Sequence, residues 1–153
     1  MKVIERKASD NKYLHRDFHI SMNMLMEYIC KEYGSSALTD YLVQFAQEFH
    51  SIRKECLQKG DLGCLEKYFK EIYEKEEWPV QIEFKNDELV ISQEACPGIS
   101  HLRKSGQKPV EQYIETYSTV YKTLCQDTPY EYVMESFNSD TGKCRQRFQR
   151  RSV

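Results

Sequence analysis

The fold is decided by residues 78–92, which read Trp-Pro-Val-Gln-Ile-Glu-Phe-Lys-Asn-Asp-Glu-Leu-Val-Ile-Ser. Apolar and polar residues alternate on both sides of the central Asn-Asp pair, and this period of two is typical of β-strands. Asn and Asp tolerate the left-handed backbone of a two-residue turn. Such a turn places Leu89 opposite Phe84 on the same face, so the segment predicts an antiparallel hairpin.

Before this hairpin, three stretches have apolar residues at helical spacing, and we expect helices over residues 14–33, 36–58 and 61–76. Gly34 and Gly60 follow the first two and favour a helix end. The second helix has the clearest apolar stripe and should be the central helix of the core. This stripe consists of Leu38, Tyr41, Leu42, Phe45, Phe49, Ile52 and Cys56.

After the hairpin, Pro109 is well placed to open a helix that runs to Cys125. Residues 130–137 and 143–150 then alternate around a turn-forming segment, and they predict a second hairpin. We therefore expect an α+β fold, with N-terminal helices packed on a mainly antiparallel four-stranded sheet built from two hairpins and an intervening helix. No linker divides the chain, so residues 1–153 should form a single domain with residues 1–13 as a loose lead-in.

The composition excludes several classes of protein. The 22 Lys and Arg residues nearly balance the 24 Asp and Glu residues, so we expect no nucleic-acid partner. No run resembles a signal peptide or a membrane span, and we therefore expect a cytosolic protein without a membrane partner. The six cysteines should then be free thiols, and the absence of a Cys-x-x-Cys pair argues against a finger-type zinc site.

The most chemically loaded segment is residues 93–107, Gln-Glu-Ala-Cys-Pro-Gly-Ile-Ser-His-Leu-Arg-Lys-Ser-Gly-Gln, which we expect to be a loop that leaves the sheet. Cys96 stands five residues before His101, with Arg103 just beyond. A thiol near these basic groups could have a lowered pKa and act as a nucleophile, with His101 as its proton partner. Alternatively, Cys96 is a small residue that ends a strand and His101 is a surface residue.

His15 and His19 stand four residues apart, so on a helix their imidazoles share a face. Such a pair can supply two ligands to zinc or another divalent metal. The Glu that accompanies the pair in metalloproteases is replaced by Arg16. A hydrogen-bonded pair at the edge of a helix explains the two residues as well.

Glu115 falls close to Tyr113 and Tyr117 on the helix expected over residues 109–125. A carboxylate among tyrosines could be an acid or base with a raised pKa, or simply a hydrogen-bonded helix residue. No phosphate-binding Gly loop or serine-hydrolase elbow occurs in the sequence, which argues against nucleotide-dependent chemistry.

The arginines of the last predicted strand could suggest a nucleic-acid site. They alternate opposite Glu131 and Glu135, however, and cross-strand charge pairing is the favoured interpretation.

The second half of the chain resembles a known family, the bacterial proteins similar to L-2-amino-thiazoline-4-carboxylic acid hydrolase. That family is similar in architecture to 4-vinyl-reductase-type and nitric-oxide-ligand-binding domains. The resemblance covers about residues 80–150 and rests on four features. They are the strand that ends at Cys96, the segment Leu-Arg-Lys-Ser-Gly at 102–106, the helix with Glu115, and Asp-Thr-Gly-Lys-Cys-Arg at 140–145.

The family pattern includes a thiol where this chain has Ile114, and related zinc-binding sensor domains have a Cys where this chain has Ser136. What the resemblance implies for this chain is a pocket between helices and sheet that holds a small, partly apolar molecule. It also suggests hydrolysis of a cyclic thio-amidine, with Cys96 and Glu115 at positions that match the family pattern. If the protein is an enzyme, we expect Cys96 as the nucleophile or a metal ligand, His101 as its proton partner and Glu115 as acid or base.

Three hypotheses follow. The first is a small-molecule-binding domain that could be such a hydrolase, with His15 and His19 closing the pocket or holding a divalent metal such as zinc. The second is a non-catalytic sensor of the same fold. The third is a dimeric interaction protein, which is favoured if Ile20 and Met24 on the first helix are exposed. A pocket lined by the candidate residues would support the first two.

Overall fold

The computed structural model describes the backbone of residues 14–152 and the side chains of residues 18–152. The predicted lead-in, residues 1–13, and the side chain of His15 lie outside this described part. The described chain has the predicted α+β architecture, with helices before and between two antiparallel hairpins.

The helical half begins with α1 (Leu14–Tyr33), as predicted, and α1 ends at Gly34, whose φ of 87° suits glycine. The prediction of one helix over residues 36–58 was wrong, because α2 (Ser35–Phe49) and α3 (Ser51–Gln58) are separate. The third helix, α4 (Gly63–Lys75), starts two residues later than predicted.

The break between α2 and α3 lies at His50, with φ −103° and ψ 14°. Side chains bind the carbonyl groups that precede it. The Ser51 hydroxyl donates to the carbonyl of Glu48 at 3.1 Å, and the Arg53 guanidinium donates to the carbonyl of Phe49 at 3.1 Å. A helix bends where side chains replace its backbone partners, so these two bonds support a change of direction at His50.

The first hairpin joins β1 (Gln81–Lys85) to β2 (Glu88–Gln93) with the predicted register, Phe84 opposite Leu89. Both turn residues have positive φ, 53° at Asn86 and 58° at Asp87. The sequence signal and the structure agree here because the turn type requires left-handed residues at both positions.

The second hairpin joins β3 (Tyr130–Phe137) to β4 (Cys144–Arg150). β4 pairs with β2, so the sheet has the order β1-β2-β4-β3 and is antiparallel throughout. In the central pair, Leu89 stands opposite Phe148, and neither side chain is exposed. The apolar side chains of these two strands form the surface on which the helices pack.

Two helices connect the hairpins. The prediction of a loop over residues 93–107 was wrong, because α5 (Pro97–Lys104) occupies most of it. Proline at the first helical position and the buried pair Ile99 and Leu102 account for this helix. The next helix starts later than predicted, since a 3-10 turn, η2 (Glu111–Ile114), precedes α6 (Glu115–Cys125).

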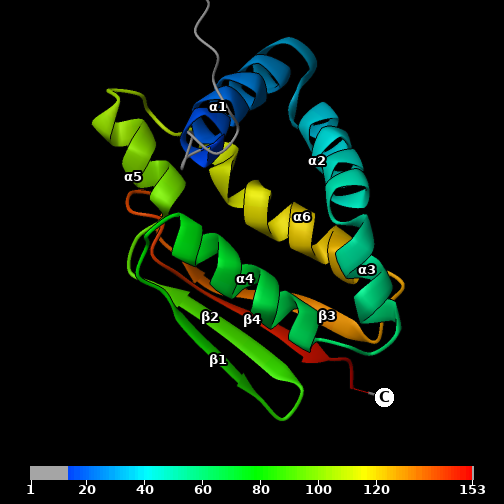
Figure 1. The fold of residues 1–153 in the computed structure, drawn as a ribbon. Coiled ribbons are helices and arrows are strands. Elements are labelled where there is room, and N and C mark those ends of the chain that lie inside the picture. Colours follow the sequence, from blue (N-terminus) through cyan, green and yellow to red (C-terminus); the bar gives the residue numbers. More distant parts are fainter. Residues whose placement is uncertain (1–13, 153) are drawn as a thin grey trace, which may run out of the picture.

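The elements form layers. Figure 1 shows α4 and α6 lying across one face of the sheet, while α1 and α2 lie farther from the sheet and α5 stands at one end. One apolar cluster fills the space between α4, α6 and the sheet, and it includes Phe69, Leu124 and Phe148. A second cluster joins α1, α2 and α6 through Met26, Leu42 and Val120.

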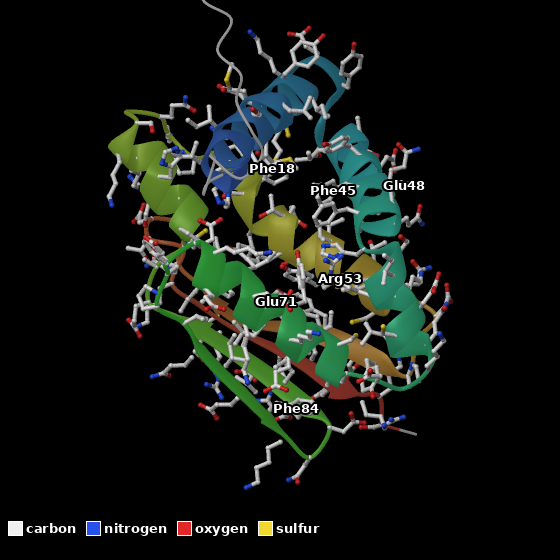
Figure 2. The ribbon with its side chains drawn as sticks, viewed as in Figure 1. Phe18, Phe45, Glu48, Arg53, Glu71 and Phe84 are labelled. Atoms are coloured by element: carbon white, nitrogen blue, oxygen red, sulfur yellow. The ribbon has the colours of Figure 1, made fainter. Side chains whose placement is uncertain are left out.

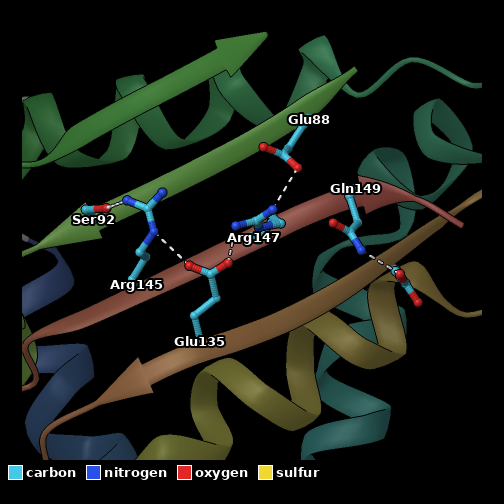
Figure 3. A network of polar contacts seen from close by, with 7 residues as sticks. Glu88, Ser92, Glu135, Arg145, Arg147 and Gln149 are labelled. Carbon is cyan, nitrogen blue, oxygen red and sulfur yellow. Dashed lines mark hydrogen bonds and ion pairs between the residues drawn. The ribbon is translucent and has the colours of Figure 1, made fainter. Parts of the chain in front are cut away.

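The opposite face of the sheet is polar, and Figure 3 shows its network. Arg145 Nε lies 2.7 Å from a carboxylate oxygen of Glu135, and Arg147 contacts both Glu135 and Glu88. Cross-strand pairing with Glu135 is confirmed for Arg145 and Arg147. Arg150 pairs instead with Asp87, and Glu131 accepts a hydrogen bond from Gln149. The helices of the described chain therefore pack on the face opposite this network.

Within residues 14–152, no helix combines the length and the apolar character that crossing a bilayer requires. All six cysteines are free thiols.

Candidate functional site

The candidate site is a cavity of about 450 Å³ between α1, α2, α4 and α6. Most of the residues that line it come from four helices that are distant in sequence. Figure 1 shows α1 and α2 on the side of α4 and α6 that faces away from the sheet. The walls of the cavity are mostly aromatic. The aromatic side chains that line it are Phe18, Phe45, Phe49, Tyr68, Phe69, Tyr73, Tyr113, Tyr117 and Tyr121.

Phenylalanines stand at the side where α1 approaches α2. The rings of Phe18 and Phe45 stack with centroids 6.2 Å apart, and those of Phe45 and Phe49 stack at 5.2 Å. Figure 2 shows Phe18 and Phe45 directed toward each other across the gap between the two helices. Phe18 is 43% exposed and Phe49 is 51% exposed, so apolar surface of the cavity wall reaches solvent on this side.

His50 lines the cavity from the break between α2 and α3 and is only 3% exposed. Its Nδ1 is buried and has no hydrogen-bond partner. Burial, reinforced by the nearby charge of Arg53, lowers the pKa of His50 from 6.5 to about 4, so the imidazole is uncharged at neutral pH. A buried polar atom without a partner costs about 1–3 kcal/mol.

Hydrogen-bonded tyrosines form the wall next to the sheet. The Tyr73 hydroxyl donates to Oε1 of Gln93 at 2.8 Å, and Nε2 of the same amide donates to the carbonyl of Gly142 at 3.1 Å. The Tyr117 hydroxyl lies 2.9 Å from the Cys96 thiol. Burial raises the pKa of both tyrosines well above the usual value, which keeps the two hydroxyls protonated and able to donate.

A His and Glu pair lies at the end of the cavity nearest α5. His19 Nε2 is 3.4 Å from Oε1 of Glu76, and His19 Nδ1 is 3.5 Å from the Tyr113 hydroxyl. Glu76 is only 8% exposed. A buried carboxylate beside an imidazole can orient the ring and share a proton with it, so this pair is the most polar part of the cavity wall.

Gly98 allows this packing. A Cβ at position 98 would lie 2.1 Å from the Tyr113 hydroxyl and 2.7 Å from His19 Nδ1. α5 can therefore approach α1 and Tyr113 closely only because residue 98 lacks a side chain.

The five predicted site residues have different surroundings. Cys96 is buried at the start of α5 behind Tyr117, and burial raises the pKa of its thiol although hydrogen bonds from Tyr117 and the amides of Ile99 and Gly98 oppose the shift. His101 is on α5, half-buried, with no hydrogen bond to Cys96 in the described part of the chain.

Glu115 accepts a hydrogen bond from the Thr119 hydroxyl at 2.6 Å and does not line the cavity. Of the predicted metal ligands, His19 lines the cavity, and the His15 side chain lies outside the described residues. Among the side chains that the structure describes, no cluster of three or more His, Cys, Asp or Glu residues could hold a metal ion.

Several residues of the cavity were missed from the sequence. Phe45 and Phe49 were assigned to an apolar stripe, and nothing in the spacing showed that this face borders a cavity. His50 falls outside the apolar stripe predicted over residues 36–58, so the spacing gave no signal that it lines the cavity.

The fold and the cavity define the class of protein: an α+β domain with an aromatic cavity between its helices. No protein-family model, no curated protein and no solved structure matches the chain. The resemblance to the amino-thiazoline hydrolase family therefore stays a prediction.

Proposed function

We propose that this protein is a cytoplasmic small-molecule-binding domain whose cavity holds a compact, largely apolar ring compound. The observation that carries the proposal is the aromatic cavity of about 450 Å³ with few polar groups. Pockets for small ligands usually have such a volume, with apolar walls and a small number of polar side chains that fix the orientation of the ligand. His19, His50 and Glu76 are such side chains here.

The size and chemistry of the walls favour planar rings. Aromatic side chains bind other rings by offset stacking or edge contacts, and each contact adds to the gain from burying apolar surface. Phe18 and Phe49 line the cavity and are partly exposed, so their side of the cavity gives a path for entry. A ligand can therefore reach the cavity without rearrangement of the core below it.

The test is binding of N-phenyl-1-naphthylamine, an uncharged probe whose fluorescence rises in apolar surroundings. Ile72 on α4 lines the cavity, and Ile72→Trp should fill part of it and weaken binding at least tenfold. The matched control is Ile52→Trp, at a side chain that is 73% exposed and outside the cavity. Equal affinity of the two variants, or no binding to the wild type, would remove the proposal.

Hydrolysis of a cyclic thio-amidine is the catalytic form of the same proposal. The supporting observation is that the Cys96 thiol adjoins Tyr117, which lines the cavity. As a nucleophile, Cys96 would need Tyr117 to move and a base to take its proton, because burial favours the neutral thiol. His101 and Glu115 keep their proposed roles as proton partner and acid or base only if the chain rearranges to bring them to the cavity.

The test of catalysis is incubation with L-2-amino-thiazoline-4-carboxylate. Addition of water at the amidine carbon and cleavage of the ring C–S bond release a free thiol, which Ellman's reagent detects. Turnover that Cys96→Ala abolishes would support the hydrolase, and turnover unchanged in that variant would remove Cys96 from the mechanism. A divalent metal held by His15 and His19 would appear as stoichiometric metal that is lost in the double Ala variant.

A homodimer remains a second proposal for α1. Met24 is 60% exposed and Tyr28 is 54% exposed, whereas Ile20 is half-buried against the cluster around Ile99. Exposed apolar side chains on one helix favour an interface. Light scattering after gel filtration tests this directly, and Met24→Lys should convert a dimer to a monomer.

A further inference from the structure

Among the described residues that line the cavity, His50 is the one with a buried side-chain polar atom that lacks a hydrogen-bond partner. The hydroxyls of Tyr73 and Tyr117 have protein partners, and His19 contacts Glu76 and Tyr113. Nδ1 of His50, by contrast, is buried and has no hydrogen-bond partner among the residues that the structure describes. Buried polar groups nearly always have partners, so an exception needs an explanation.

The His50 ring is held in one orientation. Its centroid lies 5.0 Å from that of Phe49 and 5.6 Å from that of Tyr68, each with an interplanar angle of 89°. Tyr121 packs against it at 6.0 Å. Aromatic neighbours on several sides leave the ring little freedom to rotate toward another partner, so the direction of its nitrogens is fixed in advance of any ligand.

The charge state of His50 restricts what it can bind. Because burial keeps the imidazole neutral above about pH 5, it offers one N–H donor and one lone-pair acceptor and does not attract an anion by charge. A hydroxyl group can donate to the unprotonated nitrogen or accept from the protonated one, so it fits either tautomer. A charged group would be desolvated among aromatic rings without a counter-charge from His50.

We infer that His50 is the specificity-determining residue of the cavity, and that the ligands are uncharged planar ring compounds whose hydroxyl group hydrogen-bonds to the His50 imidazole. This inference rests on the proposed function, because it requires that the cavity binds a ligand. It goes further in naming the class of ligand and the residue that selects it.

The experiment compares two probes of nearly equal shape, 2-naphthol and 2-methylnaphthalene, by titration calorimetry at pH 7. Burial of apolar surface alone would favour 2-methylnaphthalene, which is the more apolar compound. A hydrogen bond to His50 should reverse this order, and we expect the wild type to bind 2-naphthol about 5- to 10-fold more tightly. In His50→Phe this preference should disappear while 2-methylnaphthalene still binds within about threefold of its wild-type affinity.

A second measurement follows His50 in the wild-type protein. In wild-type protein labelled with ¹⁵N-histidine, 2-naphthol should shift the ring nitrogens of His50, and 2-methylnaphthalene should leave them within the range of ring-current effects. The His50 signals are assigned as those that disappear in His50→Phe or, if that variant does not fold, in His50→Asn.

The outcomes separate the two proposals. If neither probe binds the wild type, the proposed function fails. If both probes bind but the wild type does not prefer 2-naphthol, or His50→Phe keeps the preference, the cavity binds small molecules and the role of His50 is overturned.

Discussion

Gly142, in the turn between β3 and β4, gives the sharpest prediction about stability. Its φ is +71°, and an added Cβ would lie 2.2 Å from the Cβ of Cys96 and 3.0 Å from the backbone nitrogen of Cys96. The turn is also tied to the start of α5, because the amide of Cys96 donates to the carbonyl of Thr141 at 2.8 Å. Gly142→Ala should therefore disturb both the turn and α5.

Two terms contribute to the loss. A non-glycine residue in the left-handed region costs about 1 kcal/mol, and overpacking against a neighbour that cannot rotate away adds about 1–3 kcal/mol. The matched control is Gly106→Ala, because Gly106 has a similar φ of +73° with nothing within 4 Å of the added Cβ. Gly106→Ala should therefore lose only the free energy that the left-handed backbone costs.

The assay is urea unfolding followed by the fluorescence of Trp78, the single tryptophan, and by circular dichroism. We expect the free energy of unfolding to fall by about 2–4 kcal/mol in Gly142→Ala and by about 1 kcal/mol in Gly106→Ala. Equal losses in the two variants would show that the contact with Cys96 is not tight, and would refute the reasoning.

Two further predictions concern the cavity wall. Tyr73→Phe removes the donor to Gln93, leaves that buried amide oxygen unsatisfied, and should lower the free energy of unfolding by about 1–3 kcal/mol in urea titrations; an unchanged midpoint would contradict it. His50 gives a pH dependence of the free energy of unfolding. Because folding lowers the pKa of His50 from 6.5 to about 4, the unfolded chain takes up the proton at a higher pH than the folded chain does. The free energy of unfolding should therefore have its full value above pH 6.5 and decline by about 3 kcal/mol between pH 6.5 and 4. Over that window His50→Phe should show a shallower slope than the wild type, and parallel curves would show that His50 is not buried as described.

The sheet could be predicted from the sequence because its signals are local. A two-residue turn fixes the register of a hairpin, so Asn86 and Asp87 were enough to pair Phe84 with Leu89. The same holds for α1, where an apolar stripe is followed by Gly34. In each case the deciding residues lie within one element or its cap.

α5 and the break at His50 could not be predicted as easily. α5 is only eight residues long, and its apolar contacts are made with α1 and η2, which are distant in sequence. At His50 the apolar stripe continues from α2 toward α3, so periodicity alone extends the helix across the break. The break depends on side-chain bonds from Ser51 and Arg53, which spacing does not reveal.

The cavity was the hardest feature to predict. Periodicity identifies which side chains face inward, but the space between them depends on how α1, α2, α4 and α6 cross. The candidate residues chosen by chemistry alone are dispersed: Cys96 is behind Tyr117 and Glu115 bonds to Thr119. Of the candidates whose side chains the structure describes, His19 alone lines the cavity. The chemical type of a residue indicated which side chains could take part in a reaction, but it did not indicate which other side chains lie next to them.

The strand order β1-β2-β4-β3 has a consequence for how the chain folds. The central pair joins residues 88–93 to residues 144–149. During synthesis, β2 therefore has no β4 to pair with until more than fifty further residues have been added. During that interval the β1–β2 hairpin presents an unpaired edge, while the N-terminal helices can already form from local contacts. We expect the pairing of β4 with β2 to limit the folding rate. Until β4 pairs with it, the exposed edge of β2 can pair with other chains, so rapid pairing with β4 protects the nascent chain from aggregation.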